Sequence, residues 1–325
     1  MSRVVGRLTL LSEVRDLLGQ GLTVALRGPT GIGKSALLDA LDQQVSTVPG
    51  RPPLVLRAAG SPAECSLPFT ALQDLLDQLP AEPAGAPGVR PSRPAERLAA
   101  GLSTDALRSV LCAEFRALLD VLSADRAVLL LLDDLQWLDA DSMCVIGYAL
   151  RRLRGRVGSV VTIGPGGAPP DLTAVRCLEV PPLDADDTIE LLGRHGLPAH
   201  LAKRVYAESG GLPSVALGLG GAIGEHPSLL GRPTPLPASI ERVLRDRFLA
   251  QPPSVRETLV RAALLHRPTV RQLERAGRIE ADGDLRAAAA AGLVERTGDR
   301  AGDRSSDESG DLVRFVPPVL RRVVT

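Results

Sequence analysis

The sequence has little lysine, few aromatic residues and no net charge. Lys34 and Lys203 are the only lysines among 325 residues, aromatic residues make up 2%, and 38 basic residues balance 38 acidic ones. A chain without net charge has no global field that draws it to nucleic acid or to an anionic membrane. Because every other basic residue is arginine, Lys34 stands out, and its surroundings are examined below.

Long apolar runs and closely spaced cysteines are also missing. The strongest apolar run, 127–132, is far too short to cross a bilayer. The first residues, MSRVVGRLTLL, lack the layout of a signal peptide. Cys65, Cys112, Cys144 and Cys177 lie far apart without metal-ligand spacing. We therefore predict free thiols in a reducing compartment, a cytoplasmic location and no membrane partner.

Short apolar runs alternate with helical patterns in the first half of the chain. The strand-like runs are 22–27, 54–58, 127–132, 159–163 and 176–180. Helical stretches such as 71–79 and 106–122 separate most of them. Such alternation predicts an α/β fold with a parallel sheet flanked by helices. The proline-rich stretch 80–94 is predicted to be a surface loop, because strands continue after it.

Helical patterns dominate after residue 181. Asp184 is a predicted helix cap, and a second helix is expected between Pro198 and the Gly210–Gly211 pair. After a proline-rich link come further helices and a predicted hairpin, 293–297 with 312–316, whose charged tip is predicted to be disordered. The expected domains are an α/β domain at 1–181, a small helical subdomain at 182–235 and a winged-helix domain at 236–325.

The stretch RGPTGIGKSALL (27–38) fits the phosphate-loop pattern G-x-x-x-x-G-K-[ST] after a strand and before a helix. Backbone N–H groups of such a loop curl around phosphate oxygens, and the helix N-terminus adds positive charge. Lys34 is predicted to reach the β- and γ-phosphates, and Ser35 to hold Mg²⁺. The predicted phosphate-binding residues are Gly28, Gly31, Gly33, Lys34, Ser35 and Ala36.

A second motif, LLLLLDDLQWLD, delivers two carboxylates at the end of an apolar strand. Asp133 is predicted to position Mg²⁺, and Asp134 to orient or polarise the attacking water. With Lys34, these are the expected catalytic residues, with Ser35 and Asp133 as the metal ligands. An aspartate pair after a strand also serves as a helix cap in other proteins.

Four motifs occur together in the order typical of STAND-class P-loop ATPases. They are VVGR (4–7), GPTGIGKS (28–35), LLDDLQWLD (131–139) and GGLPSVAL (210–217). The stretch SLPFTALQDLL (66–76) resembles, more narrowly, the ATPase module of the large ATP-binding LuxR-family regulators of actinobacteria. This resemblance covers about residues 3 to 322.

The resemblance implies a P-loop domain, a lid and a winged helix that clamp ADP or ATP with Mg²⁺. It implies that Val5, Gly6 and Arg7 lie near the adenine and that Pro213 closes over the base. It further implies slow hydrolysis, self-association in the ATP state, and a role in transcription regulation through the transcription machinery or another protein. Such relatives continue into helical repeats and a DNA-binding helix-turn-helix, so a natural short form and a fragment both remain open.

Three positions depart from the family pattern. Gly164 and Pro165 stand where relatives usually have an arginine, and Pro317 stands where they often have a histidine. After the GR of the first motif, where relatives normally have an acidic residue, this chain has Leu8. Phosphate-facing groups supply charge-assisted stabilisation in phosphoryl transfer. We therefore predict a nucleotide holder with weak or absent turnover.

Two alternatives remain for the function. Arg267, Arg271, Arg275 and Arg278 could face DNA phosphates, although Glu274 and Glu280 interrupt the stripe and direct DNA binding is not favoured. An AAA+ machine that remodels a protein partner would need an arginine acting on a neighbouring subunit, and Arg151, Arg152 and Arg154 are the candidates.

Overall fold

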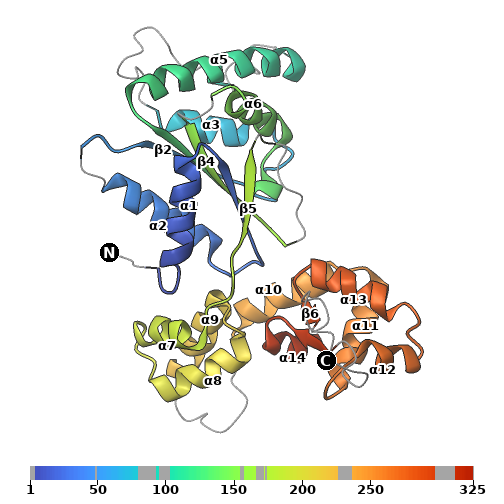
Figure 1. Ribbon diagram of the computed structural model, residues 1–325. Helices are drawn as coiled ribbons and strands as arrows, with labels where there is room; N and C mark the ends of the chain where they lie inside the picture. The colour runs from blue at the N-terminus through green and yellow to red at the C-terminus, as the bar shows by residue number, and fades with distance from the viewer. Residues whose placement is uncertain are drawn as a thin grey trace. The chain divides into compact units, whose positions relative to one another are not determined.

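The computed structural model describes residues 4–47, 50–79, 93–94, 103–153, 157–165, 172, 174–225, 236–296 and 312–324. The chain divides into two units (Figure 1). The first is Met1–Gly28 with Lys34–Val180, and the second is Pro29–Gly33 with Pro181–Thr325. Most of the predicted loop 80–94, most of the proline-rich link and the hairpin tip lie outside the described residues. Within these ranges, no helix is long and apolar enough to span a bilayer.

Five parallel strands form the sheet of the first unit. They are β1 (Thr23–Arg27), β2 (Leu54–Ala59), β3 (Val128–Asp133), β4 (Val157–Ile163) and β5 (Val175–Glu179). Their order across the sheet is β2-β3-β4-β1-β5, and every neighbouring pair is parallel. Helices are needed to connect parallel strands, and they cover the sheet. The predicted parallel sheet flanked by helices is confirmed.

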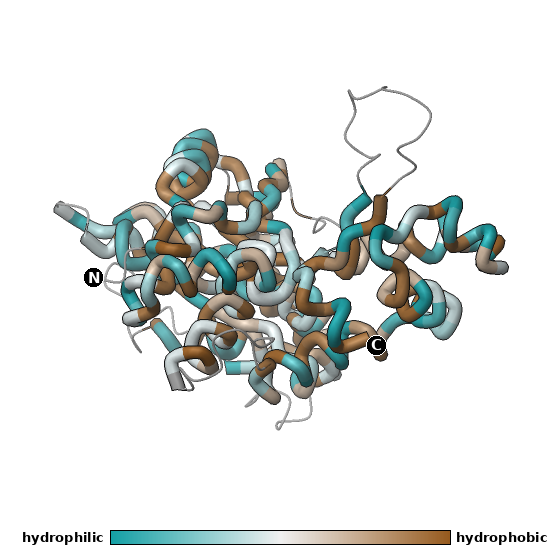
Figure 2. The backbone as a smooth tube through the Cα atoms, turned by 90° about the horizontal axis from the view of Figure 1, so that it is seen from below, coloured by the Kyte–Doolittle hydropathy of each residue, from teal (hydrophilic) through white to brown (hydrophobic). Residues whose placement is uncertain are grey.

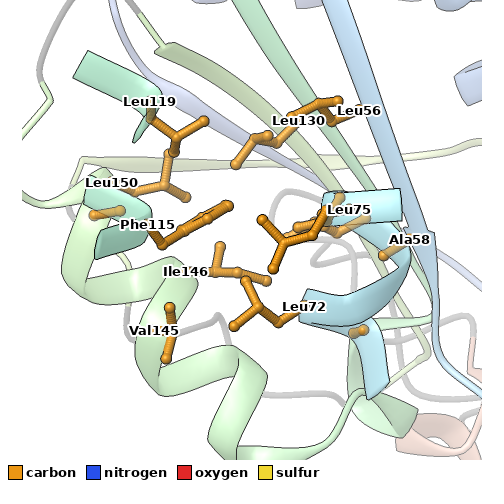
Figure 3. Packing of buried hydrophobic residues seen from close by; sticks show 14 of the residues in the cluster. Leu56, Ala58, Leu72, Leu75, Phe115, Leu119, Leu130, Val145, Ile146 and Leu150 are labelled. Carbon is orange, nitrogen blue, oxygen red and sulfur yellow. The ribbon is translucent and has the colours of Figure 1, made fainter. Parts of the chain in front are cut away.

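Three helices build the main core on one face of the sheet. They are α3 (Thr70–Asp77), α5 (Thr104–Asp125) and α6 (Ala140–Leu150). Phe115 of α5 lies between Leu72 of α3 and Leu150 of α6, in the buried cluster that also includes Leu130 of β3 (Figure 3). Along α3 and α6, residues facing this core alternate with exposed ones. Hydrophobic and hydrophilic residues likewise alternate along the helical parts of the backbone in Figure 2.

The other face of the sheet packs against α1 (Leu8–Gly19) and α2 (Lys34–Ser46). Neighbouring strand residues point to opposite faces, so Val24 and Leu131 are buried on this side. Both faces of the strands are therefore apolar, as their continuous hydrophobic runs require.

One buried carboxylate joins α3 to α6. Asp139 is 2% exposed and precedes α6, where its Oδ1 accepts the Ser142 N–H at 2.8 Å. The same carboxylate accepts the N–H groups of Phe69 (2.8 Å) and Ala71 (3.1 Å), at the start of α3. It also accepts the Thr70 hydroxyl at 3.0 Å. Asp139 therefore caps two helices at once and links the motifs SLPFTALQDLL and DDLQWLD.

The second unit begins with three helices, α7 (Ala185–Gly193), α8 (Ala199–Ser209) and α9 (Pro213–Glu225). The predicted cap is confirmed, because the Asp184 side chain accepts the Asp187 N–H at 2.8 Å. The glycine stop is confirmed as well. Gly210 ends α8 with φ of +60°, a conformation in which a Cβ would also lie 2.7 Å from Pro318 Cδ.

Helices and a short hairpin complete the second unit. The helices are α10 (Ala238–Leu249), α11 (Pro253–Leu264), α12 (Val270–Arg275), α13 (Ala281–Ala290) and α14 (Arg321–Val324), with a 3₁₀ turn η3 at Pro318–Leu320. The predicted hairpin is confirmed as antiparallel β6 (Val294–Arg296) and β7 (Val313–Phe315). This element order is the one expected for a winged helix, which stays a prediction.

Arg278 has an internal role in this unit. Its guanidinium donates to Asp284 at 2.6 Å and to Thr258 at 2.9 Å, and its side chain is only 16% exposed. Burial tends to raise the pKa of Asp284, but hydrogen bonds from Thr258 and Arg278 outweigh it and lower that pKa. The ionised carboxylate stabilises the fold at neutral pH, and this contribution is lost as the pH falls through the lowered pKa.

Replacing Asp139 should destabilise the first unit. In Asp139→Ala the buried donors of Phe69, Ala71 and Ser142 lose their acceptor, so we expect the free energy of unfolding to fall by about 3 kcal/mol. Urea unfolding followed by circular dichroism measures this. The control is Asp120→Ala at an exposed position of α5, which should change the value by less than about 0.5 kcal/mol. Equal effects of the two substitutions would contradict the capping role.

Candidate nucleotide-binding site

The predicted phosphate loop connects β1 to α2 and has the required local geometry. Gly31 and Gly33 have φ of +85° and +98°, in the left-handed region that favours glycine. Lys34 is 7% exposed, and its Nζ donates to the Gly28 carbonyl at 2.9 Å, so the ammonium group spans the ends of the loop. Ser35 and Ala36 are exposed in the first turn of α2.

The electrostatics of this loop favour an anion. α2 has 13 residues and no acidic side chain in its first turn, so the partial positive charge of its N-terminus is not neutralised locally. The Lys34 ammonium adds a full charge at the same place. Of the predicted phosphate-binding residues, Gly28, Lys34, Ser35 and Ala36 belong to the first unit, and Gly31 and Gly33 belong to the second.

The tip of the loop contacts α9 within the second unit. The Ser214 N–H donates to the Gly31 carbonyl at 3.1 Å. A Cβ on Gly31 would lie 2.0 Å from Ser214 Oγ, and one on Gly33 would lie 3.9 Å from Pro213 Cγ. Glycine is therefore required at position 31 for two reasons, its φ and this close approach. Pro213 was predicted from the motif GGLP, whereas nothing in the sequence pointed to Ser214.

Asp133 lies at the end of β3 and is held by the neighbouring strand. Its Oδ1 accepts the Thr162 hydroxyl of β4 and the Asp134 N–H at 3.1 Å. Thr162 is fully buried and pairs in register with Leu26 of β1, two residues before the phosphate loop. Thr162 thus lies between β1, which leads into the phosphate loop, and the predicted metal ligand Asp133 of β3. A polar residue near the end of a buried apolar strand was the signal that could have revealed it.

Asp134 has an unusual backbone and a fixed side chain. Its φ is +49°, and its Oδ1 accepts the Gln136 side-chain amide at 3.0 Å. Gln136 in turn accepts the Gly164 N–H at 3.2 Å. Gly164 stands where the family resemblance leads us to expect an arginine. In place of a side chain, the backbone N–H at that position is bonded to the Asp134–Gln136 pair.

The residues expected near the base lie in both units. Val5 and Arg7 are 6% and 3% exposed in the turn before α1, where Gly6 has φ of +66°. Leu8 begins α1 and is 53% exposed. Pro213 begins α9 in the second unit. Their roles towards adenine stay predictions.

A cleft of about 340 Å³ opens beside Asp133 and was not foreseen from the sequence. Its polar lining comes from Arg57, Asp74, Asp77, Gln78 and Asp133. Burial raises the pKa of Asp74, and the nearby carboxylates of Glu64, Asp77 and Asp139 raise it further. The cleft therefore holds one carboxyl group with a raised pKa, that of Asp74, next to the predicted metal ligand.

The residues present fit a nucleotide with Mg²⁺. The loop supplies a glycine cradle, a lysine and a helix N-terminus for phosphate, and Asp133 supplies an oriented carboxylate. Within the described residues, no group of three or more His, Cys, Asp or Glu side chains could hold a metal by itself. This suits Mg²⁺, which takes one or two protein ligands and completes its shell with water and phosphate oxygens.

Sheet, loop and carboxylate together define a P-loop NTPase fold. Residues 3–163 match the family model of the AAA ATPase domain. No curated protein matches the chain.

A comparison with solved structures gives matches at low sequence identity. The Walker-type ATPase of Pyrococcus abyssi aligns with a TM-score of 0.60 at 14% identity, over 99% of this chain and 96% of that chain. A STAND protein with a tetratricopeptide repeat sensor from Pyrococcus horikoshii gives 0.42 at 14% identity, over 100% of this chain and 42% of that one. A RuvB variant of Thermotoga maritima aligns with a TM-score of 0.46 at 13% identity, over 95% of this chain and 92% of that chain.

Residues 3–163 are therefore similar to an AAA-type ATPase domain and have the fold of a P-loop NTPase. The family match implies nucleotide binding, and the geometry above identifies the residues that could carry it.

The Thr162 hydroxyl should matter for magnesium-dependent binding. In Thr162→Val, Asp133 loses a donor that orients its carboxylate, so we expect the affinity for Mg-ATP to fall about tenfold. Calorimetry with and without Mg²⁺ measures this, and Thr162→Ser should retain the affinity because it keeps the hydroxyl. If valine and serine behave alike, Thr162 does not position Asp133.

Proposed function

We propose that this chain is a STAND-type regulatory switch that binds Mg-ATP or Mg-ADP, hydrolyses it slowly or not at all, and belongs to a LuxR-family transcriptional regulator. The observation that carries the proposal is the contact between Ser214 and Gly31. The predicted phosphate cradle and the start of α9 share this contact, so occupancy of the cradle would bias the position of α9. A ligand shifts a conformational equilibrium only through such differential contacts.

Each residue of the site has a defined part in the proposal. Lys34 and the N–H groups from Gly31 to Ala36 hold the phosphates, and Ser35 and Asp133 hold Mg²⁺. When bound, Mg²⁺ neutralises charge on the phosphate oxygens. Asp134, fixed by Gln136, orients water towards the terminal phosphate.

The remaining parts of the proposal rest on the family resemblance. Val5, Gly6 and Arg7 lie near the adenine, and Pro213 closes over the base. Exchange of ADP for ATP then releases the module to self-associate in the cytoplasm, with the transcription machinery or another protein as the downstream partner.

Slow turnover follows from what the site lacks by comparison with the family pattern. Gly164 and Pro165 provide no cation beside the Asp134–Gln136 pair, and Pro317 has no N–H to donate. Charge-assisted donors of this kind contribute a large part of phosphoryl-transfer catalysis.

The two alternatives have weaker support in the structure. Arg278, one of the four arginines in the proposed DNA-binding stripe, is bonded to Asp284 and Thr258 instead. Arg152, a candidate for the subunit-bridging arginine of an AAA+ machine, stacks on Tyr148 with 3.6 Å from its guanidinium carbon to the ring centre. We therefore favour the switch over a DNA-binding module or a remodelling ATPase.

Removing the lysine of the loop should abolish the function. Lys34→Ala loses the charge-assisted contacts to phosphate, so we expect ATP and ADP affinities to fall about 100-fold. Mass spectrometry of co-purified nucleotide and size-exclusion chromatography in ADP and ATP measure the loss of bound nucleotide and of the ATP-dependent size shift. The matched control is Lys203→Ala, an exposed residue of α8 and the only other lysine. Unchanged nucleotide content in Lys34→Ala would overturn the site.

Turnover should be slower than about 1 s⁻¹, the low end for an ordinary enzyme. Steady-state release of phosphate from Mg-ATP by the full chain measures it, with Lys34→Ala as the background. Sustained release at or above that rate would reject the slow switch and favour an active ATPase.

A further inference from the structure

The structure places two of the four cysteines side by side, although they lie far apart in the sequence. Cys112 is on α5 and 7% exposed, whereas Cys144 is on α6 and exposed. The two thiols are within hydrogen-bonding reach of each other. Both cysteines are free.

The packing of α5 against α6 explains this proximity. Arg108 of α5 is bonded to Asp141 of α6, with 2.5 Å between Arg108 Nη2 and Asp141 Oδ1. Cys112 lies one turn after Arg108, and Cys144 lies one turn after Asp141. The ion pair therefore marks the register in which the two helices pack, and in that register the cysteines lie next to each other. The buried core beneath them, which includes Phe115 and Ile146, holds the helices in place (Figure 3).

Two guanidinium groups lie close to the pair. One is Arg108, and the other is Arg151, which folds back along α6 until its Nη1 is 3.2 Å from the Cβ position of Gly147, one turn after Cys144. Burial and the neighbouring Cys144 thiol raise the pKa of Cys112, while Arg108 and Arg151 act in the opposite direction. The net effect is a raised pKa for Cys112, so this thiol suits the second, resolving step of an exchange rather than the first attack.

We propose that Cys112 and Cys144 form a reversible intrachain disulfide, driven by a low-molecular-weight disulfide such as oxidised glutathione. This modification site is independent of the proposed nucleotide switch. The bridge would tie α6 to α5 near the start of α6. Asp139 precedes this helix, and the segment from Asp133 to Leu138 precedes Asp139.

The chemistry is two successive thiol–disulfide exchanges. The exposed Cys144 thiolate attacks one sulfur of oxidised glutathione, forms a mixed disulfide and releases one glutathione thiolate. Cys112 then attacks the Cys144 sulfur and releases the second glutathione. The two cysteines lose two electrons and two protons in total, and the glutathione disulfide gains them as two thiols.

The other two cysteines are placed differently. Cys65 lies in the turns after β2, where its thiol donates to the Pro62 carbonyl at 3.3 Å. Cys177 lies in β5, paired in register with Ala25. A specific bridge should therefore link residues 112 and 144 and leave Cys65 and Cys177 out.

The full chain incubated with oxidised glutathione under native conditions provides the test. The number of titratable thiols should fall from four to two, with an intact mass lower by two hydrogens and without a lasting glutathione adduct on Cys144. Non-reduced peptide mapping should show Cys112 joined to Cys144, and dithiothreitol should restore all four thiols.

Matched variants make the outcome specific. Cys65→Ser should still lose two thiols, whereas Cys144→Ser, changed at an exposed position that tolerates serine, should form no intrachain bridge. Cys112→Ala should leave a glutathione adduct on Cys144, and its circular dichroism shows whether the fold is kept. The proposal is overturned if the wild-type chain keeps both thiols, stops at the Cys144 adduct, or bridges another pair.

Discussion

The candidate site depends on β4 lying between β1 and β3. Because β4 pairs with both, the phosphate loop after β1 and the carboxylate after β3 are one strand apart at the same edge of the sheet. That spacing puts the start of the predicted phosphate loop and the predicted metal ligand on either side of β4. It also places the Thr162 hydroxyl of β4 where it can hold Asp133. Parallel pairing makes the arrangement rigid, since both faces of each strand are packed.

The buried carboxylate of Asp139 connects the segment after β3 to two helices. It caps α3 and α6 together, so the segment after Asp133 cannot move without disturbing the start of α3. α3 also lines the cleft beside Asp133 through Asp74 and Asp77. This gives a physical reason why SLPFTALQDLL and DDLQWLD occur together: one supplies the N–H groups and the other supplies the acceptor.

The tip of the phosphate loop groups with a different unit from the two ends of the loop. Gly28 and Lys34 group with the sheet, whereas Pro29 to Gly33 group with the helices that follow residue 181. In the proposed switch, a nucleotide held by this loop would act on α9 through the contact between Ser214 and Gly31, which both belong to the second unit. Rapid hydrolysis would work against such coupling, because it would shorten the lifetime of the bound state. The proline and glycine at positions where the family pattern has phosphate-facing side chains agree with a long-lived complex.

Features that depend on neighbouring residues could be predicted from the sequence. The glycine–lysine loop, the apolar strands, the Asp184 cap and the glycine stop at Gly210 all use contiguous residues whose φ, propensity or spacing is set locally. Contacts between distant residues could not be predicted from the sequence. They are those of Asp133 with Thr162, Asp139 with Phe69, Ser214 with Gly31, and Cys112 with Cys144. Each joins residues tens of positions or more apart, and neither partner carries a local signal for the other. Strand order, helix register and packing decide these contacts, because only the folded core brings such side chains within bonding distance.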